Sequence, residues 1–172
     1  NINIIVKKGD EIRSEDINLF FKCYLNTINK KWSIAYLKHS FFDLILKSFI
    51  KQKIVLMQGF EKNIFVGCSL HFIGEKNFYG RYWGCLKEIP FLHFELCYYS
   101  AIEFAIKNNL KKVEAGAQGE HKIARGYQPT LTYSNHWFDH NRLNPLIKNF
   151  LVEEKKRVQD TIIYLNQFLP FR

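Results

Sequence analysis

The sequence lacks the features that mark several large classes of protein. None of its apolar runs approaches the length that crosses a bilayer, and it has no internal repeat, low-complexity tract or Ser/Pro-rich linker. Only 4 of the 172 residues are cysteine, and no two of them have CxxC spacing. Neither a disulfide scaffold nor a cysteine metal site is expected from so few and so scattered thiols. We therefore predict a cytoplasmic protein with reduced thiols and no bound metal.

The common nucleotide and hydrolase motifs are also missing. The chain has no G-x-S-x-G, no P-loop and no glycine-rich dinucleotide fingerprint. Serine hydrolase, NTPase and dehydrogenase functions therefore have no support in the sequence.

What the chain does have is apolar bulk and positive charge. Hydrophobic residues make up 47% of it and phenylalanine alone counts 16, which excludes disorder. Its length suits one domain, and we predict a single domain over residues 1–172. The formal net charge of +9 could attract nucleic acid, anionic lipid or a phosphorylated cofactor, but the lysines are scattered and form no basic block.

Hydrophobic periodicity and turn residues predict an α/β protein with a mixed sheet, in the order β-α-α-β-β-β-α-β-α-β-α. The three consecutive strands are separated by short polar turns, which indicates an antiparallel meander. The expected elements are a strand closed by Gly9 and Asp10, helices from Ser14 to about Lys30 and over 34–51, strands over 53–60, 63–74 and 77–85, a helix over 90–110, a strand over 111–118, a short helix over 119–126, a strand over 130–138 and a long helix over 143–166.

The stretch EAGAQGEHKIARGYQP, residues 114–129, is the most polar segment between two strand-like runs. It combines glycines, which allow close approach of backbone or ligand, with groups of several charges. Because side chains alternate along a strand, three polar strand faces are expected to line one cleft. These faces carry Glu114, Gly116 and Gln118; Tyr79, Arg81 and Trp83; and Ser134 with His136.

Four sequence motifs occur in a fixed order along the chain: FYGRYWGC, PFLHFELCYY, EAGAQGEHKIARGY and TYSNHW. They resemble the FemAB-like proteins of the GNAT acyltransferase superfamily, which are described as peptidoglycan biosynthesis or recognition proteins. The resemblance implies a GNAT-like acyl-CoA N-acyltransferase fold: a three-strand antiparallel meander, then β-α-β, with flanking helices and a long C-terminal helix. Members of the family are similar to paired GNAT-like domains, and this chain matches the second. It is therefore expected to be the C-terminal half of a longer protein whose N-terminal partner domain is missing here.

The loop before the central helix departs from the usual acetyl-CoA pattern. It reads GCLKEIPFLHFE, with no glycine after Gly84, and Pro90 lacks the N–H that would face a phosphate. The segment HKIARGY resembles one found in Fem relatives that use aminoacyl-tRNA. The donor is thus expected to be either acyl-CoA or aminoacyl-tRNA.

Amine acylation needs a base, oxyanion donors and a proton for the leaving group. We predict Glu114 or His121 as the general base and Tyr127 as a weaker catalytic candidate. The predicted substrate-binding residues are Lys122 and Arg125 for an anion, Gln118 for the acyl carbonyl, Arg81 and Trp83 for stacking, and Glu95, Gly119 and His136 in the cleft wall.

Structural alternatives stay open for these residues. Glu114 could form an ion pair with Arg81 or Arg125, and Glu95 could only complement a helix dipole. Arg81 and Trp83 could be sheet packing, and His121 an ordinary surface residue.

The leading hypothesis is an acyltransferase that moves an acyl or aminoacyl group to an amine, such as a small molecule or cell-wall precursor. The alternative is a non-catalytic module that uses the same cleft to recognise a peptidoglycan-type ligand or a protein. A third interpretation is an RNA-binding domain driven by the positive charge, with tRNA as a possible partner; its affinity would fall steeply with salt.

Overall fold

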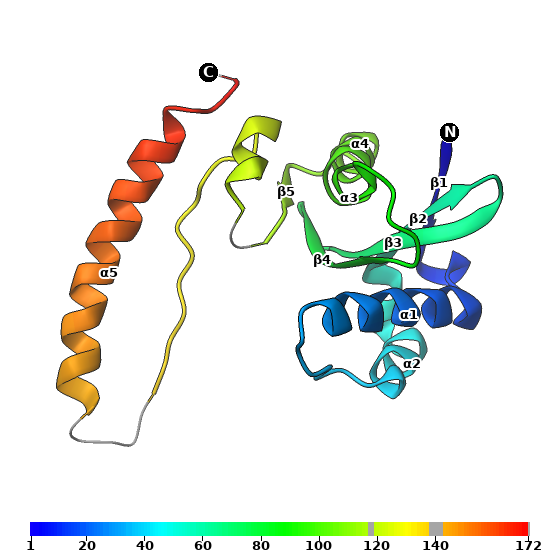
Figure 1. Ribbon diagram of the computed structural model, residues 1–172, viewed down its shortest axis with the longest axis horizontal. Coiled ribbons are helices and arrows are strands. Elements are labelled where there is room, and N and C mark those ends of the chain that lie inside the picture. Colours follow the sequence, from blue (N-terminus) through cyan, green and yellow to red (C-terminus); the bar gives the residue numbers. More distant parts are fainter. Residues whose placement is uncertain (117–118, 138–142, 172) are drawn as a thin grey trace. The chain divides into compact units, whose positions relative to one another are not determined.

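The computed structural model describes residues 1–116, 119–137 and 143–171 (Figure 1). The chain divides into two compact units, Asn1–Gly116 and Ala117–Arg172. The first unit contains the sheet and the helices that cover it. The second contains a short 3-10 helix and a long α-helix.

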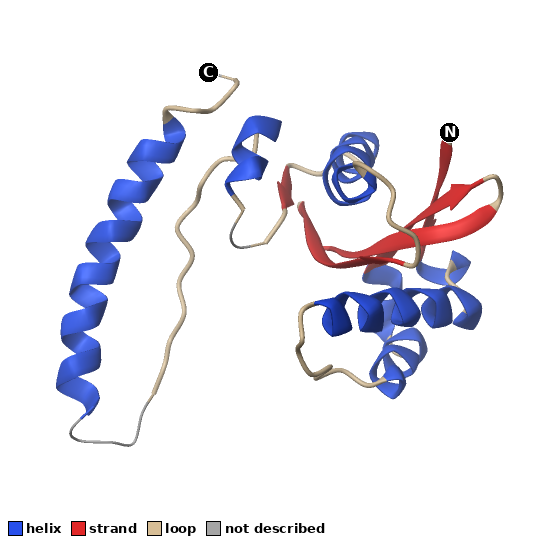
Figure 2. Ribbon diagram, in the orientation of Figure 1, coloured by secondary structure: helices blue, strands red, loops and turns tan. Residues whose placement is uncertain are grey.

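A five-stranded mixed sheet forms the centre of the first unit, in the order β1-β2-β3-β4-β5 (Figure 2). The first four strands pair antiparallel, whereas β5 runs parallel to β4. The α/β class and the predicted meander of β2, β3 and β4 are thereby confirmed, with β1 added along the side of β2. The strands are β1 (Ile2–Lys8), β2 (Ile54–Glu61), β3 (Ile64–Ile73), β4 (Asn77–Cys85) and β5 (Lys112–Glu114).

Helices cover both faces of this sheet, as Figure 1 shows. One face lies under α1 (Ser14–Lys30) and α2 (His39–Lys47), and the other under a helix that runs through α3 (Leu92–Phe94), η3 (Glu95–Tyr99) and α4 (Ser100–Lys107). Successive side chains of β2 point to opposite faces of the sheet and contribute to both cores. Ile54 and Leu56 lie in the core under α1, while Val55 and Met57 lie in the core under α4. The near-continuous apolar run of β2 is therefore what a strand buried on both faces requires.

Helix α1 packs directly on the backbone of β4 at Gly84. A Cβ atom at this position would lie 2.2 Å from the Cys23 carbonyl oxygen and 2.7 Å from Thr27 Oγ1. Such distances are shorter than any real contact, so glycine is required for the close approach of helix and strand.

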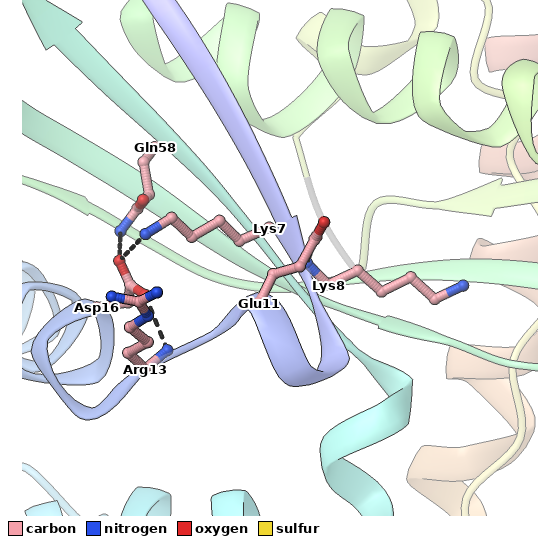
Figure 3. A network of polar contacts seen from close by, with 6 residues as sticks. All are labelled: Lys7, Lys8, Glu11, Arg13, Asp16 and Gln58. Atoms are coloured by element: carbon pink, nitrogen blue, oxygen red, sulfur yellow. Dashed lines mark hydrogen bonds and ion pairs between the residues drawn. The ribbon is translucent and has the colours of Figure 1, made fainter.

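The start of α1 is fixed by the carboxylate of Asp16, which is buried against side chains of β1 and β2 (Figure 3). Asp16 Oδ1 accepts hydrogen bonds from Lys7 Nζ at 2.6 Å and from Gln58 Nε2 at 3.1 Å, and Oδ2 accepts one from Arg13 N at 2.9 Å. Burial raises the pKa of the Asp16 carboxyl, but the three donors outweigh burial, so this pKa lies below its usual value. The network joins the first strand, the first helix and the second strand.

Three predicted elements are wrong in extent or kind. The second helix begins at His39 instead of residue 34, because Ile34 is 88% exposed and has no core to pack against. Strand β5 is limited to Lys112–Glu114. Residues 130–137 form no strand: Tyr133 and Trp137 are exposed, and no neighbouring strand pairs with this segment within the described chain. An extended, aromatic-rich run becomes a strand only when a second strand completes its hydrogen bonds.

The second unit contains η4 (Glu120–Arg125) and α5 (Leu143–Asn166), close to the predicted short and long helices. Gly119 and Gly126, with φ of 93° and 86°, flank η4 in the left-handed region that favours glycine. Within the described chain, no helix is both long enough and apolar enough to span a bilayer.

Candidate functional site

A pocket opens in the first unit where β4 and β5 part. The parallel ladder runs from Asn77↔Lys112 to Tyr79↔Glu114 and ends there, although β4 continues to Cys85. The pocket has a volume of about 130 Å³, and both the open strand and the helix above the sheet contribute to its wall. Its lining residues are His71, Gly80, Arg81, Tyr82, Trp83, His93, Cys97, Tyr98 and Ala115.

A β-bulge in β4 shapes the floor of the pocket. Gly80 lies opposite His71 and Tyr82 lies opposite Leu70, which leaves Arg81 as the extra residue. After the bulge, Tyr82 packs into the core under α1 and Trp83 into the core under α4. The predicted common face of Tyr79, Arg81 and Trp83 is therefore wrong, because simple alternation does not survive an inserted residue.

Arg81 is held against the aromatic groups of the α1 side. Its Nη2 donates to Tyr36 Oη at 3.2 Å, and its guanidinium carbon lies 4.4 Å from the centre of the Tyr82 ring. Burial, and then a hydrogen bond with Tyr36, raise the pKa of the Tyr82 hydroxyl, so Tyr82 stays neutral. Arg81 thus lines the pocket as a cation placed over an aromatic ring.

The helix above the sheet has π geometry over Glu95–Tyr99, and Cys97 and Tyr98 of this segment line the pocket. One turn earlier, the His93 ring lies 4.9 Å from that of Trp83. π-segments inside α-helices occur frequently at functional sites, since they shift side chains relative to a regular helix. The combination of a strand bulge and a helix insertion at one pocket is a feature that periodicity could not predict.

His71 is the functional candidate that sequence reasoning missed. Its ring is 1% exposed and lines the pocket, and its Nε2 lies 2.7 Å from Ser69 Oγ. Ser69 Oγ in turn donates to the Leu96 carbonyl oxygen at 2.9 Å. Burial lowers the pKa of His71 to about 4, against a smaller opposing effect of the Leu96 carbonyl. The signal in the sequence was the polar pair at 69 and 71, which alternates within an otherwise apolar strand.

The two predicted carboxylates of this unit have local partners. Glu114 Oε1 accepts a hydrogen bond from Asn77 Nδ2 at 3.0 Å on the exposed side of the short ladder. Glu95 Oε1 accepts one from Ser100 Oγ at 3.2 Å. Glu114 immediately precedes Ala115 of the pocket wall, whereas Glu95 begins the π-segment. Neither carboxylate is a lining residue of the pocket.

The remaining predicted site residues belong to the second unit. Arg125 Nη1 donates to the His121 carbonyl oxygen at 2.6 Å, and Tyr127 N donates to the Lys122 carbonyl oxygen at 3.2 Å. His136 Nε2 lies 2.9 Å from Ser134 Oγ, and Gly119 caps η4, while Gln118 lies outside the described residues. Arg81 and Trp83 therefore share one pocket in the first unit. In the second unit, His121, Lys122 and Arg125 lie in η4, and Tyr127 follows it.

Side chains of α1 occupy part of the open edge of β4. Thr27 Oγ1 donates to the Trp83 carbonyl oxygen at 3.1 Å, and Asn26 Nδ2 donates to the Cys85 carbonyl oxygen at 2.6 Å. The following loop is tied to α1 by an ion pair between Lys30 and Glu88 at 2.6 Å. Strand residues between the end of the β5 ladder and Trp83 therefore form the accessible part of this edge.

The loop that leads into the central helix does not provide a row of backbone donors for phosphate. Pro90 has no N–H, and Phe91, the residue before α3, has φ of 67°. Among the described residues, no three His, Cys, Asp or Glu side chains are grouped so that they could hold a metal ion.

The parted parallel strands, the helix above them and the antiparallel meander define a GNAT-type α/β domain. The chain matches the FemAB-like family, described as peptidoglycan biosynthesis/recognition, over residues 1–172, and it belongs to that family. Comparison with curated protein sequences finds no significant match.

Solved acetyltransferases have similar folds. An aminoglycoside acetyltransferase from an uncultured soil metagenomic sample, in complex with sisomicin, has a TM-score of 0.52 and 12% identity, over 81% of this chain and 95% of that one. A predicted acetyltransferase from Clostridium acetobutylicum, with acetyl-CoA, has a TM-score of 0.52 and 12% identity, over 84% of this chain and 98% of that one. AAC(6')-Iy in complex with a CoA bisubstrate analogue has a TM-score of 0.51 and 8% identity, over 81% of this chain and 99% of that one. At these identities the likeness establishes the GNAT fold of this chain.

Proposed function

We propose that this protein transfers an acyl group from an acyl-CoA to the amine of a small molecule. The observation that carries the proposal is the pocket at the parting of β4 and β5, which a strand edge, a cation and two histidines line together. Family membership and fold support the same class of reaction. The acetyl-CoA and sisomicin of the related structures suggest the chemical type of donor and acceptor.

The open segment of β4 suits a thioester arm that carries amide groups. Backbone groups of Gly80 to Tyr82 have no β5 partner in the ladder, and an extended ligand can add to such an edge as a short strand does. The pocket beside them offers room for the acyl end. In the reaction, a neutral amine attacks the thioester carbon: the N–C bond forms, the C–S bond breaks, the nitrogen gives up a proton to a base, and the leaving thiolate takes one up.

The predicted roles of individual residues belong to this proposal. Glu114 and His121 are the candidate bases and Tyr127 the weaker candidate, while Lys122 and Arg125 would bind an anion of the donor. Aminoacyl-tRNA as an alternative donor, and an N-terminal partner domain, likewise stay predictions. Loss of a positioned base typically lowers the rate by about 10²–10⁴, so Glu114→Gln is expected to lower acyl transfer at least about tenfold. Unchanged turnover would remove Glu114 from the mechanism.

The experiment uses the purified chain with acetyl-CoA and a panel of amines that includes sisomicin and ethylamine. Release of the CoA thiol and the mass of the acylated product are measured together. A pocket-blocking variant, Ala115→Trp, should abolish transfer, while Lys112→Trp, at an exposed position of the preceding strand β5, should leave it nearly unchanged. Equal activity in both variants would show that the pocket is not where the reaction takes place.

A binding module is the second candidate, favoured by the loop before α3. Pro90 and the left-handed Phe91 replace the backbone donors that commonly bind pyrophosphate, and the Lys30–Glu88 ion pair engages a cation nearby. Calorimetry with CoA, acetyl-CoA, aminoacyl-tRNA and muropeptides separates the two. Binding of a muropeptide without turnover would favour the module, and release of CoA favours the enzyme.

A further inference from the structure

We propose that His71 Nδ1 is the hydrogen-bond acceptor that selects the ligand of the pocket, and that this ligand presents a single N–H or O–H donor. His71 lines the pocket, its ring is 1% exposed, and Nδ1 has no hydrogen-bond partner in the described part of the chain. Buried acceptors in proteins are nearly always satisfied, since they have lost their water. A hydrogen-bond donor that enters from the pocket satisfies His71 Nδ1.

The tautomer of His71 follows from its neighbour. Ser69 has one hydroxyl hydrogen, which it donates to the Leu96 carbonyl oxygen. At the 2.7 Å contact with Ser69 Oγ, His71 Nε2 must therefore carry the hydrogen and donate. The lone pair is then on Nδ1. Because Leu96 belongs to the π-segment, the carbonyl that determines which nitrogen of His71 accepts is provided by that segment.

A glycine lies on the side of the His71 ring that could receive a donor. A Cβ atom at Gly80 would lie 3.7 Å from His71 Nδ1, and it would meet no other atom closer than 3.5 Å. On its face, the ring is stacked on Phe78, with centroids 4.8 Å apart and planes 10° from parallel. Since so little of the ring is exposed, the donor has to be a single small group, such as one N–H or O–H.

The consequence is a chemical filter at the floor of the pocket. A neutral imidazole nitrogen accepts from an amine, an amide N–H or a hydroxyl, whereas a carbonyl or carboxylate oxygen there would face its lone pair. In naming the ligands, this inference rests on the proposed function. That function supplies two sources of the shared donor chemistry: the nitrogen of the acceptor amine, and an amide N–H of the pantetheine arm of CoA.

The experiment follows the two ring nitrogens of His71 by NMR in the full chain labelled with ¹⁵N-histidine. Long-range ¹H–¹⁵N spectra are recorded without ligand, with CoA alone and with ethylamine or sisomicin alone. Without ligand, the spectrum should show a protonated Nε2 and an unprotonated Nδ1. The Nδ1 signal should then move in the direction of an accepted hydrogen bond with whichever source fills the site, which distinguishes amide from amine.

Two variants test the same contact by affinity. His71→Phe keeps an aromatic ring for Phe78 but removes the acceptor, and Gly80→Ala keeps the acceptor but fills the space in front of it. Each should weaken binding of that ligand about tenfold, the effect of one net hydrogen bond of the stronger kind. The matched control His39→Phe changes a histidine that is bonded to Asp43 and Asn18 outside the pocket, and should leave the affinity unchanged.

The outcomes separate this inference from the proposed function. An Nδ1 signal that moves without any acyl transfer would refute the enzyme and keep the binding contact. Transfer that persists in His71→Phe, with a static Nδ1 signal in the parent chain, would refute the contact and keep the enzyme. A protonated Nδ1 without ligand, or an Nδ1 already bonded to a trapped water and unmoved by ligands, overturns the inference. So does failure of both CoA and the amines to bind.

Discussion

Acid should destabilise this protein through His71 by an amount that can be worked out in advance. Burial lowers the pKa of His71 to about 4 in the folded chain, against 6.5 as the ordinary value. Well above pH 6.5 the ring is neutral in both states and contributes nothing. As the pH falls below 6.5, the unfolded chain binds a proton that the folded chain does not, so stability is lost until about pH 4. These two values correspond to about 2 kcal/mol lost at pH 5 and about 3 kcal/mol at pH 4.

The comparison is between the parent chain and His71→Phe, by urea unfolding at pH 7 and pH 5 with tryptophan fluorescence as the signal. The difference in unfolding free energy between the two proteins at pH 7 measures any effect of the substitution on packing, and it is subtracted from the difference at pH 5. Between the two pH values, the parent should lose about 2 kcal/mol more than the variant, because only the parent has the titrating ring.

Equal pH dependence in the two proteins would refute the reasoning. It would mean that His71 is not held neutral in the folded chain, and the argument for Nδ1 as an open acceptor would lose its basis. Direct titration of His71 by NMR gives the same answer independently, since its midpoint should lie near pH 4.

Three further substitutions have defined outcomes in urea unfolding. Asp16→Asn should cost about 2–4 kcal/mol at pH 7, because one amide oxygen cannot satisfy the donors on both oxygens of the buried carboxylate. The pKa of Asp16 is lowered in the folded chain. The difference in unfolding free energy between the parent and Asp16→Asn should therefore be fully present above pH 3.8 and shrink as the pH falls through the pKa of the folded state. A difference that stays constant with pH would contradict the network. Gly84→Ala should cost about 3 kcal/mol or more, since its Cβ would meet the backbone of α1 at 2.2 Å, and a neutral effect would contradict the close packing. Ser69→Ala should cost about 1–3 kcal/mol by leaving two buried groups unpaired, and should change the tautomer signal of His71 in the NMR spectrum; an unaltered signal would contradict the assignment.

Local patterns were sufficient for most of the fold. The apolar runs of β2, β3 and β4 and the turns between them predicted the meander, because each strand is buried enough for its composition to be decisive. Lys62 and Asn63, with φ of 48° and 67°, form the tight connection that the polar turn indicated. The prediction of a strand over 130–138 is wrong for the described residues 130–137. A strand forms only with a pairing partner, and the sequence of the segment alone does not say whether such a partner exists.

The candidate site was predictable only in part. Arg81 and Trp83 were selected from their strand, and both line the pocket. The alternation that joined them to Tyr79 failed at the bulge, which arises from the register between two strands and leaves no mark in either one alone. His71 was overlooked because a single histidine in an apolar strand usually means a satisfied core residue. Its open nitrogen becomes visible only with the positions of Ser69 and Gly80.

The hydrogen bonds from Thr27 and Asn26 to β4 have a consequence for how this protein behaves in a crowded solution. A bare strand margin invites another polypeptide to pair with it, and self-association of this kind is the usual penalty for leaving a sheet unfinished. By engaging the carbonyls of Trp83 and Cys85 with its own helix, the chain protects the end of that margin and leaves a short gap over Gly80 to Tyr82. A gap of this length is too short to template a foreign strand.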